Sequence, residues 1–313
     1  MYNESIRAEN KIISNNDLTE IFQAMGDTLK KYKKISDQEA MQNHMLESQY
    51  QKYTFKDEGS KMKVNVDFYD NTNITFDNFD GFMGIFYSRI DEIKSLDVNY
   101  SLYYQVMEPA PNRKIDTYIQ TIRMHITENK LDISLDLKSA DPKLNDVYNL
   151  IKSKVLNAPE KYDETIRNRN KITNTVGFSI GLIPAIVITS LLLFIPILNK
   201  IFFHGYVVYP IVALVLSYLI GSVIAPSKLD KYYESIVPKK KYAGHDSNFN
   251  SVYEDDIDSF VGTSEILIGK KVNNLENRKM ILNEYNKRKA LIPKGMIAIL
   301  IGTVVVVIIG LFI

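Results

Sequence analysis

Long uncharged stretches stand out in the pattern of hydrophobic and polar positions along the chain. Residues 172–199 and 201–227 contain no Asp, Glu, Lys or Arg, and residues 295–313 form a third stretch of this kind. A bilayer crossing requires about 20 predominantly apolar residues. The pattern therefore predicts three transmembrane helices, of which the first two form a hairpin and the third is a C-terminal span over residues 293–313.

Basic residues gather directly outside these stretches, at positions 161–171, 228–241 and 287–294. Because Lys and Arg concentrate in cytoplasmic flanks, we expect all three flanks in the cytoplasm. The chain opens on polar residues without a signal-peptide pattern, so the region before the first span is expected to be cytosolic as well. The sequence thus predicts a multi-pass protein of the cell (inner or plasma) membrane, with residues 228–292 in the cytoplasm and the C-terminus outside.

The first 158 residues show helical and strand periodicities in turn. Apolar residues at helical spacing predict two helices within residues 14–53, the second beginning at a capping box formed by Ser36 and Glu39. Alternating apolar and polar residues predict strands, and further helical spacing predicts helices around them. The expected strands are 62–68, 98–106, 117–126 and 131–137, and the further helices are 78–95 and one that starts at Asp141-Pro142.

These elements predict an α+β head domain over residues 1–158, large enough to bury its own core. The fold class is therefore an α+β cytosolic head joined to an α-helical membrane region. The remaining domains are expected to be a helical stalk, the transmembrane hairpin, a cytosolic loop followed by a long helix at 263–291, and the C-terminal span. Their boundaries are 159–171, 172–227, 228–292 and 293–313.

The amino-acid composition excludes several classes of function. The chain has no cysteine, which excludes disulfides, thiolate metal sites and thiol nucleophiles, and its formal net charge is only +1. Residues 1–158 hold 20 basic and 24 acidic residues, whereas the remainder holds 18 and 13. A mildly acidic head lacks the basic surface that neutralises phosphates, so no nucleic-acid partner is expected. Abundant Lys, Asn and Ile suggest a bacterial or phage origin.

No motif indicates an enzyme, a cofactor or a metal site. The four histidines are far apart, and the acidic run at Asp77 lacks the ligand positions of a calcium loop. The glycines at 262 and 269 are separated by six residues, whereas a phosphate loop requires four. The spans contain no ionisable residue of the kind that ion-coupled carriers place within the membrane. We therefore expect a protein that is not an enzyme and binds no cofactor.

Two groups of residues are candidates for contacts. Small residues that let membrane helices approach closely are Gly177, Gly181, Gly295, Ala298, Gly302 and Gly310. A partner surface is expected on the tyrosine-rich strand and on the long cytosolic helix. Its residues are Tyr100, Tyr103, Tyr104, Val272, Leu275, Leu282 and Tyr285.

Two functions of different classes fit this architecture. The first is a non-enzymatic membrane protein whose cytosolic head binds a partner, as an accessory or scaffold subunit of a membrane assembly would. Its partners would be the lipid bilayer and other membrane or cytosolic proteins. The alternative is an oligomeric membrane-permeabilising effector or channel gated by the head, because an uncharged pore can gate by dewetting. That alternative requires self-association into a homo-oligomer.

Overall fold

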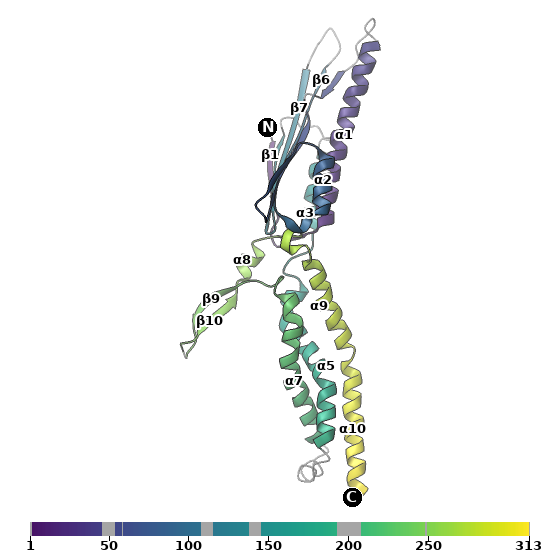
Figure 1. Ribbon diagram of the computed structural model, residues 1–313, viewed down its shortest axis with the longest axis vertical. Helices are drawn as coiled ribbons and strands as arrows, with labels where there is room; N and C mark the ends of the chain where they lie inside the picture. The colour runs from purple at the N-terminus through teal and green to yellow at the C-terminus, as the bar shows by residue number, and fades with distance from the viewer. Residues whose placement is uncertain are drawn as a thin grey trace. The chain divides into compact units, whose positions relative to one another are not determined.

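The computed structural model describes residues 2–45, 54–57, 59–107, 115–137, 145–192, 208–247 and 249–312. These residues form a mixed α+β structure with a sheet-rich N-terminal region (Figure 1). The chain divides into two compact units, and each unit is built from two stretches. The first unit contains Met1–Lys161 and Pro238–Asn273, and the second contains Tyr162–Val237 and Asn274–Ile313.

The first unit is organised around a seven-stranded antiparallel sheet. The strands run in the order β1, β8, β7, β6, β4, β5, and β3 also pairs with β6. Alternation explains β4, in which Met62, Val64, Val66 and Phe68 are buried, as the sequence predicted. The bounds are β1 Tyr2–Arg7, β3 Thr54–Asp57, β4 Lys61–Phe68, β5 Asn73–Phe76, β6 Ile93–Met107, β7 Ile115–Thr127 and β8 Lys130–Leu137.

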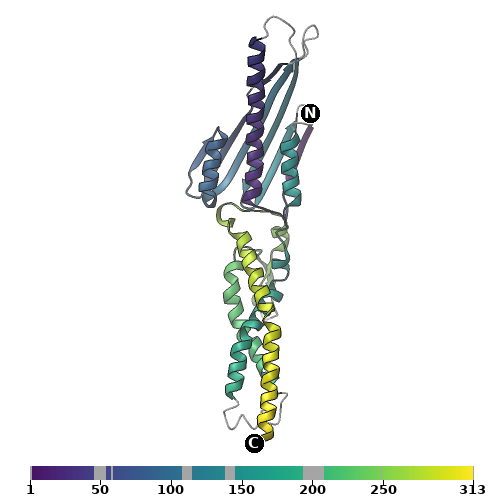
Figure 2. The same cartoon turned by 90° about the vertical axis from the view of Figure 1, so that its right-hand side faces the viewer.

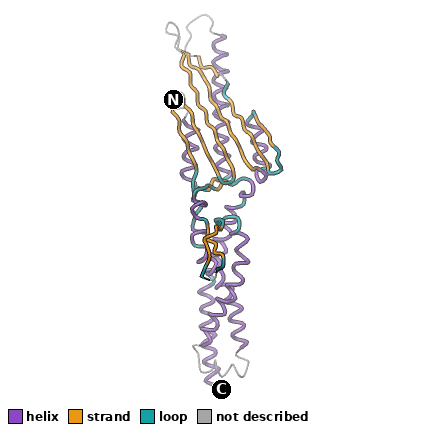
Figure 3. The backbone as a smooth tube through the Cα atoms, turned by 90° about the vertical axis from the view of Figure 1, so that its left-hand side faces the viewer, coloured by secondary structure: helices purple, strands orange, loops and turns teal. Residues whose placement is uncertain are grey.

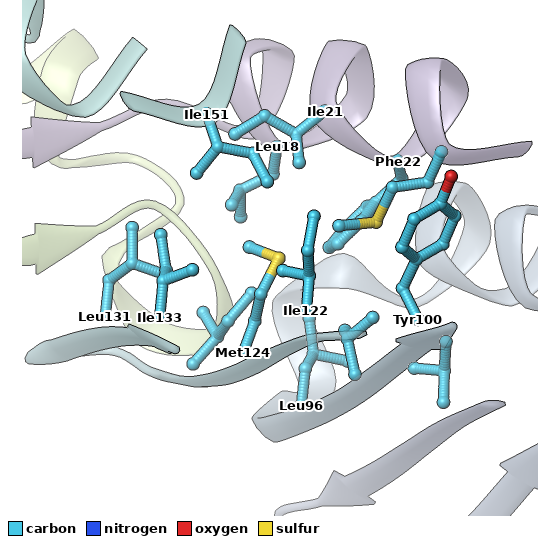
Figure 4. Close-up of a cluster of buried hydrophobic side chains, with 14 of the residues drawn as sticks. Leu18, Ile21, Phe22, Leu96, Tyr100, Ile122, Met124, Leu131, Ile133 and Ile151 are labelled. Atoms are coloured by element: carbon cyan, nitrogen blue, oxygen red, sulfur yellow. The ribbon is translucent and has the colours of Figure 1, made fainter. Parts of the chain in front are cut away.

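Three helices cover one face of this sheet, namely α1 Asn15–Met45, α2 Phe79–Ser88 and α3 Asn145–Asn157 (Figure 2). The core lies between the helices and the sheet (Figure 4). Leu18, Ile21 and Phe22 of α1 are fully buried there, against strand residues such as Leu96 and Ile122. In the opposite view the strands lie in front of α1, α2 and α3, and no helix among the described residues covers this second face of the sheet (Figure 3).

Two expectations for residues 1–158 were wrong. Ser36 does not begin a second helix, because α1 continues to Met45 and no Gly or Pro interrupts it after Gly26. The helix expected at 78–95 ends at Ser88, and a 3-10 turn at Ile90–Glu92 leads into β6. The expected helix cannot continue to residue 95, since Ile93 already pairs with Phe68 of β4.

Residues 238–273, here called the return segment, join the first unit after a gap of 76 positions in the sequence. The sequence predicted a loop in its first part, but the structure has a hairpin of β9 Lys240–His245 and β10 Ser251–Asp255, followed by α8 Ile257–Val261. The strand β11 Glu265–Ile266 then pairs in parallel with β2 Ile12–Ile13. Consequently the long helix expected from residue 263 begins only at Asn274.

The second unit consists of helices. They are α4 Glu164–Arg167, α5 Arg169–Leu192, α7 Val208–Tyr233, α9 Asn274–Lys289 and α10 Ile292–Phe312. By length and composition, α5 and α7 are able to cross a membrane. The expected stalk helix is interrupted, because α4 is one turn long and Asn168 separates it from α5.

Candidate functional site

The uncovered face of the seven-stranded sheet, here called the open face, is polar throughout its centre. Antiparallel pairing aligns Arg7, Asp132, His125 and Asp97 across β1, β8, β7 and β6. His125 Nδ1 lies 2.7 Å from Asp97 Oδ1, and Arg7 Nε lies 3.9 Å from Asp132 Oδ1. Basic side chains therefore alternate with carboxylates along this row. Antiparallel sheets commonly leave such a face to water, and they can equally present it to a ligand.

The neighbouring row contains Ser5, Ser134, Arg123 and Asn99. The two serines are short, and two shallow hollows of about 470 and 320 Å³ share Ser5, Ser134 and Arg123 in their walls. Arg123 is exposed and forms no ion pair with any residue that the structure describes. The open face therefore offers a guanidinium between the Ser134 hydroxyl and the Asn99 amide, with carboxylates in the adjacent row.

Asp67 lies at the other end of the open face. Ser95 Oγ donates a hydrogen bond of 2.7 Å to its carboxylate, and the amide of Asn73 donates another. Both bonds favour the charged form, with Ser95 contributing most, so the pKa of Asp67 lies below its ordinary value. These bonds therefore extend the ionised form of this carboxylate to lower pH than usual.

The described residues offer no chemistry that would make the open face a metal centre. No group of three or more His, Asp or Glu residues among them could hold a metal ion. The basic side chains, carboxylates, hydroxyls and amides of the open face are suited to hydrogen bonding with a polar ligand or a polar protein surface.

The tyrosine side chains of β6 lie on both faces of the sheet. Tyr100 is fully buried beneath the helices, whereas Tyr103 lies on the opposite side and is partly exposed. The side chain of Tyr104 lies outside the described residues. Because side chains alternate along a strand, Tyr100 and Tyr103 cannot belong to one surface. Of the three, Tyr103 is the residue that the structure places on the outside.

The candidate residues near α9 flank its buried side. Leu275, Leu282 and Tyr285 are half-buried, and Val272 precedes the helix in a half-buried position. Tyr285 packs against a cluster of the second unit that includes Ile166, Ile172 and Ile281. The inward side of α9 is formed by Asn274, Arg278 and Ile281, which the sequence analysis did not single out.

Small residues bring α5 and α7 into close contact. A Cβ added to Gly177 would lie 2.7 Å from the carbonyl oxygen of Gly221, and one added to Gly181 would meet the backbone of Ser217. The α7 side of this seam repeats every four residues, at Ala213, Ser217, Gly221 and Ala225, all of them buried. The close contact was predicted from the sequence for the α5 glycines but not for this repeat, although its four-residue spacing is present in the sequence.

The small residues of α10 are divided between two sides. A Cβ on Gly295 would lie 2.6 Å from Leu182 Cδ1, and one on Gly302 would lie 2.6 Å from the Tyr209 hydroxyl oxygen. Ala298 is exposed, so it does not share this side. Gly310 lies within α10, but its surroundings are outside the described residues.

Charged side chains connect the helices of the second unit at positions the sequence could not pair. Arg278 of α9, with 4% of its side chain exposed, lies 2.9 Å from the carboxylate of Asp163. Glu284 is 2.8 Å from both Lys228 of α7 and Arg288 of its own helix. Burial raises the pKa of Glu284, but the hydrogen bonds from Lys228 and Arg288 outweigh it and hold the pKa below its ordinary value.

No protein-family model, curated protein or solved structure shows a significant match to this chain.

Proposed function

We propose that this chain is a non-enzymatic integral membrane protein whose cytosolic head binds a partner, as an accessory or scaffold subunit of a membrane assembly. In this proposal α5, α7 and α10 span the membrane. The head and the return segment lie in the cytoplasm, where the basic flanks of the spans place them by the positive-inside rule.

The observation that carries the membrane assignment is the exposure of apolar side chains along these helices. Ile183 of α5 is 70% exposed, Val223 of α7 is 76% exposed, and Leu300 of α10 is 67% exposed. A helix in the core of a soluble protein would bury such side chains, and soluble proteins rarely expose contiguous apolar patches beyond a few hundred Å². Lipid is the environment that removes this surface from water.

The proposed topology is tested by single cysteines, because the chain has none of its own. Asn199→Cys is expected to react with an impermeant maleimide on intact cells, whereas Ser247→Cys reacts only after permeabilisation. The reverse labelling pattern would overturn the orientation. Solubility of the intact chain without detergent would overturn the membrane assignment.

Partner binding is supported by the open face, where Arg123 has no ion-pair partner among the described residues and lies beside two hollows. The test is in-cell crosslinking of the tagged chain, followed by mass spectrometry and native sizing. Arg123→Glu is expected to release a stoichiometric partner that the wild type retains. The matched control is Lys31→Glu, which reverses the charge of an exposed residue on the helix-covered side. A partner retained equally by both variants would exclude the open face.

The second candidate function is an oligomeric pore. It is favoured by the same exposed apolar faces, which offer surface for self-association, and by the runs 172–199, 201–227 and 295–313, which contain no Asp, Glu, Lys or Arg. Dye leakage from liposomes that contain the purified chain distinguishes the two functions. Leakage that rises with oligomer formation supports the pore, and intact vesicles at high protein load exclude it.

A further inference from the structure

The tip of the β9–β10 hairpin presents a phenylalanine to solvent. Phe249 is 85% exposed, more than any other large hydrophobic side chain among the described residues. The hairpin stands apart from the seven-stranded sheet of its own unit (Figure 1). A side chain of this kind loses free energy in water, so its position requires a physical reason.

The backbone of the tip makes this placement more unusual. Phe249 has φ +62°, in the left-handed region that Gly and Asn adopt readily and bulky residues rarely do. Asp246 holds the turn, since its carbonyl accepts from Phe249 N at 3.0 Å and its carboxylate accepts from Asn250 N at 2.8 Å. Residues held in such strained conformations gather at functional positions, which makes Phe249 a candidate for a contact.

Two tyrosines extend the aromatic character along the hairpin. Tyr242 and Tyr253 are 54% and 57% exposed, and their rings meet edge to face at 5.9 Å. At the base of the hairpin, Lys241 lies 3.3 Å from the carboxylate of Asp256. This ion pair lies away from the tip, where the Asp246 carboxylate is engaged with the backbone of the turn and Phe249 is the exposed apolar side chain.

We propose that the hairpin tip inserts Phe249 into the headgroup region of the lipid bilayer, with Tyr242 and Tyr253 above it. The inference rests on the proposed membrane function. Tyrosine favours this region because its ring is apolar and its hydroxyl is polar, whereas phenylalanine gains by placing its apolar ring at the boundary of the acyl chains. Residues 238–258 hold three lysines against five carboxylates, so the contact depends on the aromatic ring rather than on anionic lipid.

The length of chain allows this contact. The uncharged part of α7 ends at Ser227, and the helix continues for six residues to Tyr233, a rise of about 9 Å. The six residues of β9 span about 20 Å in an extended strand. Residues 234–239 add further chain between α7 and β9, so chain length does not prevent the tip from reaching the bilayer surface.

A lipid surface also fits the size of the tip better than a protein does. A stable protein interface buries about 800 Å² on each partner. One phenylalanine on a narrow two-stranded hairpin supplies far less apolar area than this. A bilayer requires no complementary surface, so a single aromatic ring suffices for contact once the chain is already anchored.

Tryptophan fluorescence tests the proposal, because the chain contains no Trp and a single substitution gives the only indole signal. The full chain carrying Phe249→Trp is reconstituted into vesicles of zwitterionic lipid with nitroxide labels at shallow or deep positions of the acyl chain. We expect a blue-shifted emission and stronger quenching by the shallow label than by the deep one. Thermal unfolding of the variant verifies that the fold is retained.

Two further variants serve as references. Val223→Trp, on the exposed side of α7, lies four residues or about 6 Å inside Ser227, so it is expected to be quenched by both labels, and more by the deep label than Phe249→Trp is. Tyr87→Trp, at 57% exposure on the head, is expected to remain accessible to acrylamide and unaffected by either label. Both references substitute side chains of similar exposure to the hairpin aromatics.

The outcomes separate the inference from the proposed function. Quenching of Val223→Trp without quenching of Phe249→Trp would overturn the inference and leave the membrane assignment standing. An unquenched Val223→Trp would overturn the membrane assignment itself. Protection of Phe249→Trp from acrylamide without lipid quenching would mean that a protein surface, such as a second copy, covers the tip, and this too would overturn the inference.

Discussion

The head domain should fold only when the return segment is present. Ile266 and Ile268 of that segment are fully buried in the core of the first unit. Backbone hydrogen bonds fix them there, from Ile266 N to Glu128 O at 3.0 Å and from Leu267 N to Ile13 O at 2.9 Å. A fragment of residues 1–161 lacks all of these contacts and exposes the apolar surface that they cover.

The expected effect is comparable to the stability of a whole domain. Loss of a buried isoleucine side chain costs about 2–5 kcal/mol, so two of them cost about 4–10 kcal/mol. Domains of ordinary size have a free energy of unfolding of about 5–15 kcal/mol. A fragment of residues 1–161 should therefore be unfolded or close to it.

Urea unfolding followed by circular dichroism checks this prediction on two fragments. The first is residues 1–161, and the second joins residues 1–161 to residues 238–273 through a flexible Gly/Ser linker. We expect a cooperative transition only in the joined fragment. In that fragment, Ile268→Ala should lower the free energy of unfolding by about 2–5 kcal/mol. The control Ile257→Ala, at a residue 40% exposed in the same segment, should change it by less than about 1 kcal/mol. Equal stability of the two fragments would refute the reasoning.

Three further substitutions have defined expected outcomes. Gly221→Leu should weaken α5–α7 packing by about 1–3 kcal/mol or more, seen as a lower melting temperature in detergent, whereas Val223→Leu on the exposed side should not. Because the pKa of Glu284 is lowered in the folded state, its contribution to stability is present above its unfolded value of 4.5 and is lost as the pH falls through the folded pKa. Glu284→Gln should therefore flatten the loss of stability on acidification, and the exposed Glu276→Gln should leave the profile unchanged. Phe249→Asn should raise stability by about 0.4–1 kcal/mol in detergent solution, because Asn tolerates a positive φ, and unchanged or lower stability would contradict the strain at the hairpin tip.

The elements that could be predicted from the sequence are those whose pattern is local. The alternation in β4 and β8 follows directly from which side chains face the core, so both strands were expected where they occur. The uncharged runs likewise indicated the long apolar helices α5 and α7. In each of these cases the signal is contained within a single element.

The elements that were missed depend on partners distant in the chain. The strand β1 is short and mostly polar, with Asn3, Glu4 and Ser5 in succession, and it forms because β8 pairs with it over six residues. The pairing of β11 with β2 joins positions about 250 residues apart, and no local pattern indicates it. The same holds for the buried ion pair of Arg278 and Asp163. The mixed α+β character and two membrane-length helices were thus accessible to sequence reasoning, whereas the stretches of chain that make up each unit were not.

The division of the first unit into two stretches has a consequence for folding. The chain leaves this unit after Lys161 and returns at Pro238, and Lys161 Nζ donates a hydrogen bond of 2.7 Å to Thr263 Oγ1 on the return segment. Domains of large proteins generally fold as units while the chain is synthesised from the N-terminus. Here the core is complete only once Ile268 has been made, which is after α4, α5 and α7 of the 162–237 stretch. Closure of the head therefore follows synthesis of α5 and α7. A variant that prevents packing of α5 on α7 is expected to leave the N-terminal stretch able to fold. A chain that lacks the return segment is expected to leave this stretch unable to fold.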